Sequence, residues 1–244
     1  MASGSPTDGA AGGDVDIAAA ARLMADSSRA AVLIELTDGR ALPPSELAEV
    51  AGVSRSTISG HLAMLRKAGF LAVERGGRNR YYRLSGPRVA EAVEALAALA
   101  PRREVRSLRQ ANRAGALGAA RTCYGHLAGR LGVGVTEAMG ERGLLEREAE
   151  VFLLTHAGAA WLAEIGLERP PRAGKTCNDW SERRPHLAGK LGVALAKRLF
   201  ELEWLERTEV RRAVRVTDRG ARELRARLGL EATPASVVPT ASGR

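Results

Sequence analysis

The sequence predicts a mainly helical protein with short β-hairpins, which places it in the α+β fold class. Three observations support this prediction. Hydrophobic residues recur at helical spacing along most of the chain. Alanine and arginine, which favour helices, are abundant, whereas aromatic residues make up only 4% of the chain. Short alternating stretches around glycines are typical of hairpins. We therefore expect leucine, valine and alanine to build the cores.

The overall composition excludes several classes of protein. The 244 residues are 45% hydrophobic, which is enough for one to three domains with real cores. No run of about 18 apolar residues is present, so we expect no contact with a membrane. The first residues lack the basic and apolar segments of a signal peptide. Two cysteines cannot form a disulfide scaffold, and the chain is expected to be cytoplasmic.

Positive charge is concentrated in two places. The chain carries 37 Lys and Arg against 28 Asp and Glu, a net charge of +9. Residues 1–100 are balanced, with 11 basic and 11 acidic side chains, whereas residues 101–122 hold six arginines and one glutamate. Within the balanced part, Arg75 to Arg83 includes four arginines and no acid. Such clusters favour a polyanionic partner, and ordinary solvated surface is the alternative.

The first hundred residues are predicted to form five helices and one hairpin. Asp26 or Ser27 can cap the second helix, Pro44 suits the first turn of the third, and Ser54 can cap the fourth. The hairpin has its turn at Gly76-Gly77. The expected helices span residues 15–25, 28–37, 44–51, 55–68 and 87–100, and the hairpin spans residues 70–84.

The third and fourth predicted helices carry the clearest functional pattern. A short helix, a turn at Gly52 and a second helix capped by Ser54 have the layout of a helix-turn-helix. Short polar side chains and one guanidinium remain on the exposed start of the second helix, where they can enter a DNA major groove. The basic hairpin tip suits the phosphate backbone or the minor groove. The predicted DNA-binding residues are Ser54, Arg55, Ser56, Thr57, Ser59, His61, Arg75, Arg78, Asn79 and Arg80; for His61, packing that orients the helix is the alternative.

A specific set of residues follows the turn at Gly52. It consists of Ser54, Ser56-Thr57-Ile58-Ser59, His61-Leu62, Leu65, Ala68-Gly69-Phe70-Leu71 and Arg80-Tyr81-Tyr82-Arg83-Leu84. With these residues the region resembles the ArsR-type family of bacterial winged-helix repressors. The resemblance covers about residues 15–100, and it implies a homodimer in which the first and last helices of the domain pair. It also implies a double-stranded DNA operator with two half-sites. Gly60 departs from the pattern, because many relatives carry a larger polar residue there.

Metal sensing, which many members of that family perform, is not carried over to this domain. No cysteine lies in the first 122 residues, and the helix at 87–100 contains no histidine. The usual ligands of the family are therefore missing from the N-terminal part, and no motif there calls for a cofactor.

The second half of the chain repeats itself. The stretch from His126 to Val133 recurs sixty residues later, from His186 to Val193. Each copy is predicted to form a helix, a short hairpin and a second helix, which indicates an internal duplication packed about a pseudo-twofold axis. The expected helices span residues 124–142 and 156–166 in the first copy, and 186–202 and 218–229 in the second.

These patterns divide the chain into six segments. Both ends are poor in large hydrophobic residues and are expected to be disordered. The predicted segments are a tail at 1–13, a winged helix-turn-helix domain for DNA binding and dimerisation at 14–100, a basic connector helix at 101–122, a first repeat at 123–168, a second repeat at 177–230 and a tail at 231–244.

Each copy brings one cysteine and one histidine to its start. Cys123 and His126 are expected to share a helix face, and Cys177 precedes His186 by nine residues. The two pairs could bind a thiophilic ion such as Zn²⁺, Cu⁺ or arsenite, or form a redox-sensitive disulfide. Simple burial of the thiols and helix capping by the histidines are the alternatives. These four residues are the candidate metal ligands.

Aromatic residues also gather in the second half, which holds every tryptophan. They could line a pocket for a small-molecule effector, or they could be ordinary core. The candidate effector-binding residues are Cys123, Tyr124, His126, Trp161, Cys177, Trp180 and His186.

The sequence as a whole predicts a dimeric, sequence-specific DNA-binding transcriptional regulator that acts as a repressor. Its C-terminal module would bind an effector or consolidate the dimer, and an effector would act by favouring a dimer with the wrong half-site spacing. Three alternatives stay open: regulation without a ligand, thiol or metal sensing through Cys123 and Cys177, and an enzyme. The sequence lacks a phosphate-binding glycine loop and hydrolase or zinc-protease motifs, so no enzyme activity is expected.

Overall fold

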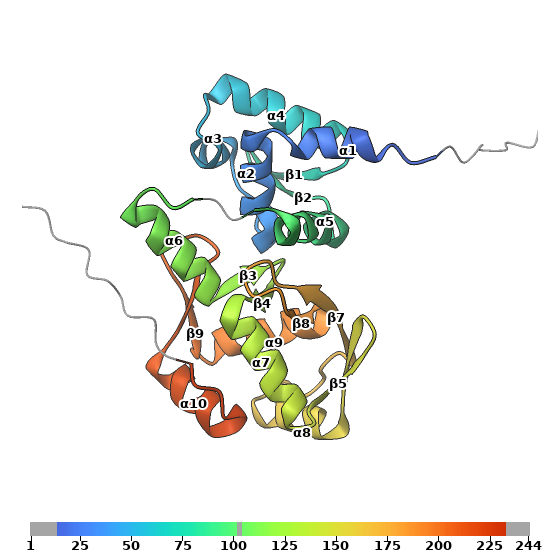
Figure 1. Ribbon diagram of the computed structural model, residues 1–244, viewed down its shortest axis with the longest axis vertical. Coiled ribbons are helices and arrows are strands. Elements are labelled where there is room, and N and C mark those ends of the chain that lie inside the picture. Colours follow the sequence, from blue (N-terminus) through green and yellow to red (C-terminus); the bar gives the residue numbers. More distant parts are fainter. Residues whose placement is uncertain (1–13, 102–103, 233–244) are drawn as a thin grey trace, which may run out of the picture.

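The computed structural model describes residues 14–101 and 104–232, and it confirms the mixed helical and β fold. Of the tails predicted at 1–13 and 231–244, residues 1–13 and 233–244 lie outside the described residues. Two parts follow each other along the chain (Figure 1): α1 to α5 with one hairpin, then α6 to α10 with the remaining strands. Within the described ranges, no helix has the length and apolar character needed to cross a membrane.

The N-terminal part has the helices and the hairpin that the sequence predicts, with bounds that agree to within two residues. The strands β1 and β2 pair in antiparallel register from Leu71 opposite Leu84 to Gly76 opposite Asn79. The elements are α1 (Ile17–Met24), α2 (Ser27–Glu35), a 3-10 turn η1 (Leu36–Asp38), α3 (Pro44–Ala51), α4 (Arg55–Lys67), β1 (Leu71–Gly76), β2 (Asn79–Leu84) and α5 (Pro87–Leu99).

Local chemistry fixes the orientation of α4. The Ser54 side chain accepts a hydrogen bond from the amide of Thr57 and so begins the helix. Gly52 ends α3 with a φ of 65°, a conformation that glycine adopts without strain. The apolar side of α4 is buried in the N-terminal core, with Ile58, Leu62 and Leu65 at most 1% exposed. Its opposite side therefore faces solvent.

The C-terminal part contains two copies of one order of elements: hairpin, helix, hairpin, helix. It follows the connector helix α6 (Leu108–Ala119), which is shorter than the predicted helix at 101–122. The first copy has β3 (Arg121–Cys123), β4 (His126–Ala128), α7 (Gly129–Glu141), β5 (Leu145–Glu148), β6 (Val151–Leu154) and α8 (His156–Glu164). The second has β7 (Ala173–Asn178), β8 (Pro185–Ala188), α9 (Gly189–Glu201), β9 (Leu205–Arg207), β10 (Val214–Val216) and α10 (Asp218–Leu228).

The two copies share one sheet and one core. The strands β5, β6, β7 and β8 form a four-stranded antiparallel sheet in that order, so that β6 of the first copy pairs with β7 of the second. A single buried apolar cluster includes residues of α7, α8, α9 and α10. The two copies therefore pack against each other within one chain. Their origin by duplication stays a prediction.

The long helices predicted at 124–142 and 186–202 begin later than expected. Gly129 and Gly189 are the first helical residues, with φ values of 75° and 68°, and extended alanines precede them. A backbone with this conformation cannot continue the helix toward the N-terminus. The preceding residues form the strands β4 and β8 instead.

This difference overturns one prediction about the cysteines. Cys123 and His126 do not share a helix face, because they stand opposite each other across the hairpin of β3 and β4. Cys177 and His186 form the equivalent pair across β7 and β8. The histidines do not cap helices either, since Ala128 and Ala188 occupy the capping positions. The unequal spacings of three and nine residues reflect only the length of the hairpin loops.

Equivalent glycines in the two copies sit where a side chain has no room. A Cβ at Gly158 would overlap the carbonyl oxygen of Leu144, and a Cβ at Gly220 would overlap that of Trp204. Each glycine amide donates a hydrogen bond to a threonine hydroxyl, Thr155 or Thr217, at 2.9 Å. The start of the last helix in each copy therefore packs directly on backbone.

We expect Gly158→Ala to lower the free energy of unfolding by about 1–3 kcal/mol, because the added methyl group meets backbone that cannot rotate away. Gly140→Ala is the matched control, since no atom lies within 4 Å of its Cβ position on α7. This control should stabilise the chain by up to about 1 kcal/mol. Urea unfolding of the full chain measures both effects, and equal values for the two variants would contradict the close approach.

Candidate nucleic-acid interface and cysteine–histidine cluster

The start of α4 presents a polar face to solvent. Ser54, Arg55, Ser56, Thr57 and Ser59 are all exposed. Their hydroxyl groups bond one another and the helix backbone: the Ser54 oxygen lies 2.8 Å from that of Ser56 and 2.9 Å from that of Thr57. Ser59 donates to the carbonyl of Arg55 at 2.9 Å. A hydroxyl group keeps free lone pairs after one such bond, so this face can still contact DNA.

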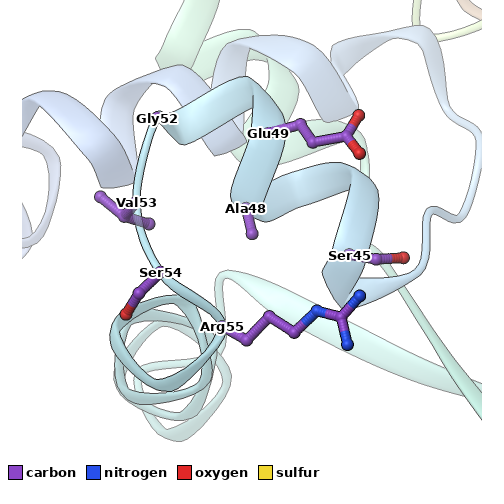
Figure 2. Close-up of a pocket in the computed structure, with 7 residues that line it drawn as sticks. All are labelled: Ser45, Ala48, Glu49, Gly52, Val53, Ser54 and Arg55. Carbon is purple, nitrogen blue, oxygen red and sulfur yellow. The ribbon is translucent and has the colours of Figure 1, made fainter.

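Arg55 lies at the rim of an open hollow between α3 and α4. Figure 2 shows its side chain reaching from the first turn of α4 toward Ser45 on α3. Among the described residues, Arg55 forms no ion pair, so its charge is available to a ligand. The residues that line the hollow are Ser45, Ala48, Glu49, Gly52, Val53, Ser54 and Arg55.

His61 lies apart from this exposed face. Its side chain is only 14% exposed and packs at the start of α2, with Nδ1 3.4 Å from an Arg29 nitrogen and Nε2 3.9 Å from Asp26. A hydrogen bond from the Arg29 amide, with the charges of Arg29 and His61, holds the pKa of Asp26 below its ordinary value. These contacts support the alternative role for His61, which is to orient α4.

The hairpin tip concentrates positive charge. Arg75, Arg78, Asn79 and Arg80 are all exposed, and Arg75 stands directly opposite Arg80 in the strand register. Like charges at facing positions destabilise a hairpin. Arg83 forms an ion pair with Glu74 and adds no free charge. Arg75, Arg78 and Arg80 have no ion-pair partner among the residues that the structure describes, and they form a site that a polyanion would stabilise.

The two cysteine–histidine pairs meet in the C-terminal part. The sulfur atoms of Cys123 and Cys177 and a ring nitrogen of His126 lie within 4.8 Å of one another. The Nε2 atoms of His126 and His186 are 3.1 Å apart. Cys123 and both histidines are buried, whereas Cys177 keeps part of its surface exposed. The structure therefore brings together all four candidate metal ligands.

Hydrogen bonds within this cluster favour one thiolate. The Cys123 thiol donates to Cys177, and with further hydrogen bonds from His126 and His186 this lowers the pKa of Cys177. The same hydrogen bond raises the pKa of Cys123, and burial adds to that increase. Burial lowers the pKa of His126. These shifts favour the thiolate form of Cys177 and the neutral form of His126.

A buried ion network lies beside the cluster. Arg121 in β3 contacts Asp179 at 2.9 Å and Glu94 at 3.8 Å, and Arg212 contacts Glu94 at 3.3 Å. All four side chains are at most 5% exposed, and their charges sum to zero. Burial opposes the charge on Asp179, but Arg121 and the hydrogen bonds that Asp179 accepts outweigh it and lower its pKa.

This network connects the two parts of the chain. Glu94 belongs to α5, whereas Arg121 and Arg212 belong to the first and second copies. Further contacts cross at the same place: Arg212 donates to the carbonyl of Ile34 at 2.9 Å, and the Tyr124 amide donates to that of Thr37. The sequence analysis missed these residues. One signal was present in the sequence: Glu94 follows Ala90 by four residues and Val93 by one, and both of these apolar residues are buried in α5.

The remaining candidate effector residues do not line a common pocket. Trp161 belongs to the buried apolar core, and Tyr124 packs against the N-terminal core. The ring of Trp180 lies 4.5 Å from the Arg121 guanidinium, as in a cation–π contact. A hollow between α7 and α9, next to Leu127 and Leu187, measures about 10 Å³, which holds at most one water molecule.

Comparison with known proteins identifies the family. A family model described as a helix-turn-helix domain matches residues 24–74. The HTH-type transcriptional regulator YdfF of Bacillus subtilis (strain 168) is 39% identical over 211 residues, which cover 84% of this chain and 93% of YdfF. The chain belongs to the HTH-type transcriptional regulators. Because 211 residues exceed the N-terminal part, the likeness of this regulator to YdfF extends into the C-terminal module.

Other matches to this regulator are shorter. CmtR of Mycobacterium tuberculosis (strain H37Rv) is 36% identical over 75 residues, which cover 31% of this chain and 63% of CmtR. The solved structure of HlyU from Vibrio cholerae has 30% identity and a TM-score of 0.31, and the match covers 34% of this chain and 88% of HlyU. The ArsR-type resemblance of the N-terminal part is confirmed, as is the prediction of a DNA-binding transcriptional regulator.

We expect Glu94→Gln to lower the free energy of unfolding by about 3–5 kcal/mol, because it leaves two buried guanidinium groups short of one negative charge. Glu223→Gln is the matched control, since Glu223 forms a partly exposed pair with Arg227 at 2.7 Å. The control should cost less than about 1 kcal/mol. Chemical denaturation of both variants measures the difference, and a small effect at Glu94 would show that the network is dispensable.

Proposed function

We propose that this regulator binds a DNA operator as a homodimer and represses transcription, with α4 reading base edges and the β1–β2 hairpin contacting phosphates or the minor groove. The observation that carries the proposal is the exposed polar start of α4, which combines hydroxyl groups with the unpaired Arg55. Repression follows from the resemblance to ArsR-type repressors. The proposed place of action is the cytoplasm, and no enzyme activity is part of the proposal.

Exposed apolar side chains support the homodimer. Large hydrophobic residues remain in solvent at α1 and α5, the two helices that the family resemblance pairs between protomers. Both helices also pack on α2. Burial of such residues in a second copy removes apolar surface from water. These residues are Val15 just before α1, Ile17 at its start, and Leu96 and Leu99 on α5.

The C-terminal module is proposed to control the spacing of the two recognition helices. Two copies of α4 must lie about 34 Å apart to reach successive major grooves. Glu94 ties α5 to both C-terminal copies, so a shift within the module reaches the proposed dimer helix directly. The small hollow between α7 and α9 argues against a large organic effector there. A bound ion, or assembly of the dimer alone, fits the module better.

We expect Arg55→Ala combined with Thr57→Ala to weaken binding to the preferred operator by at least about tenfold, since each lost base contact costs about 1–3 kcal/mol. The operator can be selected from a random duplex pool by the wild-type chain. Arg219→Ala is the matched control, because Arg219 is exposed on α10, far from α4 (Figure 1). Unchanged affinity of the double variant would overturn the assignment of α4.

Arg78→Ala in the same assay separates the roles of helix and hairpin. A phosphate contact carries no sequence information, so this variant should weaken binding to all duplexes alike. The slope of log affinity against log salt should fall by about one. Loss of discrimination between operator and random DNA would instead assign Arg78 to base readout.

We expect Leu99→Glu to shift the protein from dimer to monomer, because a charge replaces an exposed apolar group in the proposed interface. Leu99 is 84% exposed in the single chain, so folding of the protomer should not change. Val151→Glu, at an exposed position of the C-terminal sheet, serves as the control. Sedimentation velocity measures the mass of each variant. A wild-type chain that sediments as a monomer would overturn the homodimer.

A further inference from the structure

Four side chains with metal-binding atoms converge where the two C-terminal copies meet. Cys123 and His126 come from one hairpin, and Cys177 and His186 from the other. The two sulfurs and a ring nitrogen of His126 lie within 4.8 Å of one another, and His186 lies 3.1 Å from His126. We propose that Cys123, His126, Cys177 and His186 form a binding site for one Zn²⁺ ion in each chain. Two thiolates with two imidazoles are a ligand set typical of tetrahedral zinc sites.

The distances between the ligand atoms fit such a site. Zinc–nitrogen bonds of about 2.0–2.1 Å in a tetrahedron place two ligand nitrogens about 3.3 Å apart. The Nε2 atoms of His126 and His186 are 3.1 Å apart. Zinc–sulfur bonds of about 2.3 Å place two sulfurs about 3.8 Å apart, and the sulfurs of Cys123 and Cys177 lie within 4.8 Å of each other and of a His126 ring nitrogen. His186 joins these three residues through its contact with His126. Small side-chain movements therefore complete the geometry.

The backbone of the second copy leaves space for the first copy's histidine. A Cβ at Gly192 in α9 would lie 3.2 Å from the Cβ of His126. At Gly125, in the turn between β3 and β4, a Cβ would lie 3.3 Å from the Val193 side chain. Glycine at both positions allows the two hairpins to approach. The cluster is thus a packed junction between the copies.

The charges of the region are consistent with a divalent cation. Two cysteine thiolates neutralise Zn²⁺, so an occupied site carries no net charge into the interior. The neighbouring network of Arg121, Arg212, Glu94 and Asp179 is also neutral and needs no charge from the cluster. Neither group of side chains carries a net charge that the other group would have to balance.

One unsatisfied atom also supports the site. Nδ1 of His186 is buried and has no hydrogen-bond partner among the described residues, although Asp179 lies 3.9 Å away. A histidine that binds zinc through Nε2 carries its proton on Nδ1 and donates it to a carboxylate or carbonyl nearby. If His186 binds the ion through Nε2, its Nδ1 proton can be donated to the carboxylate of Asp179.

The site has four protein ligands and leaves no position for a substrate, which indicates a structural or sensory ion rather than a catalytic one. The partly exposed Cys177 provides the route by which the ion exchanges with solvent. Asp179 and Arg121 each lie two residues from a cysteine ligand, and Arg121 contacts Glu94 on α5. On the basis of the proposed function, we infer that Zn²⁺ at this site changes the affinity of the dimer for DNA.

Metal binding by the full chain tests the site directly. Protein freed of metal with a chelator and kept reduced is titrated with Co²⁺, which reports tetrahedral geometry and thiolate ligands by its absorption. We expect one Co²⁺ per chain, with thiolate-to-cobalt charge-transfer bands, and displacement by one equivalent of Zn²⁺. Failure to bind either ion at micromolar concentration would overturn the site, as would binding without thiolate bands.

Variants identify the ligands. Cys177→Ser and His126→Gln should weaken binding by more than the roughly tenfold that changes of outer-shell residues cost. His156→Gln is the matched control, because His156 is exposed at the start of α8, and it should bind Co²⁺ as the wild-type chain does. Circular dichroism shows whether each variant is folded. Should Cys177→Ser not fold, His126→Gln, which keeps both thiols, decides the question.

Two further outcomes separate this proposal from its competitors. A Cys123–Cys177 disulfide in the purified chain, with no metal binding after reduction, would assign the pair to redox chemistry and overturn the zinc site. For the regulatory step, Zn²⁺ should change affinity for the selected operator by roughly tenfold or more in the wild-type chain, but not in His126→Gln. Stoichiometric binding with unchanged DNA affinity would overturn the coupling. Absence of DNA binding by the wild-type chain both with and without Zn²⁺ would overturn the proposed function.

Discussion

The structure depends on complete pairing of four buried charges. Arg121, Arg212, Glu94 and Asp179 come from α5, from β3, and from loops of the second copy, and none of them has water to replace a missing partner. A charge left alone in such an interior costs several kcal/mol. The network therefore fixes how the N-terminal part sits on the C-terminal part. If only apolar side chains met at this junction, the two parts could shift against each other at little cost. Paired buried charges permit only the arrangement in which each charge meets its partner.

The N-terminal fold could be predicted because its signals are local. The Ser54 side chain caps α4 by accepting a hydrogen bond from the amide of Thr57. Gly52 adopts the left-handed conformation that ends α3, and the apolar residues of α4 recur at helical spacing. Each of these features is decided within a few residues of the chain. The prediction of a homodimer came from the family resemblance, because the periodicity of a single sequence does not reveal how copies of the chain associate.

The C-terminal elements were harder to predict, because their decisive interactions join distant residues. The stretch from His126 to Ala128 has helix-forming residues beside it, yet it forms a strand because β3 pairs with it and Gly129 has a positive φ. The four candidate ligands were identified from the repeat. Their meeting depends on strand register, which spacing along the chain does not encode. The ion network escaped prediction for the same reason, since Glu94 and Arg212 are 118 residues apart.

The pairing of β6 with β7 has a consequence for shortened forms of this regulator. The first copy supplies two strands of the four-stranded sheet and the second copy supplies the other two. A polypeptide that stopped after α8 would leave β6 with an open backbone edge and would expose leucines that α9 normally covers. Open edges recruit strands from other molecules. Such a fragment should aggregate, so the first copy cannot serve as an independent module despite its complete set of elements.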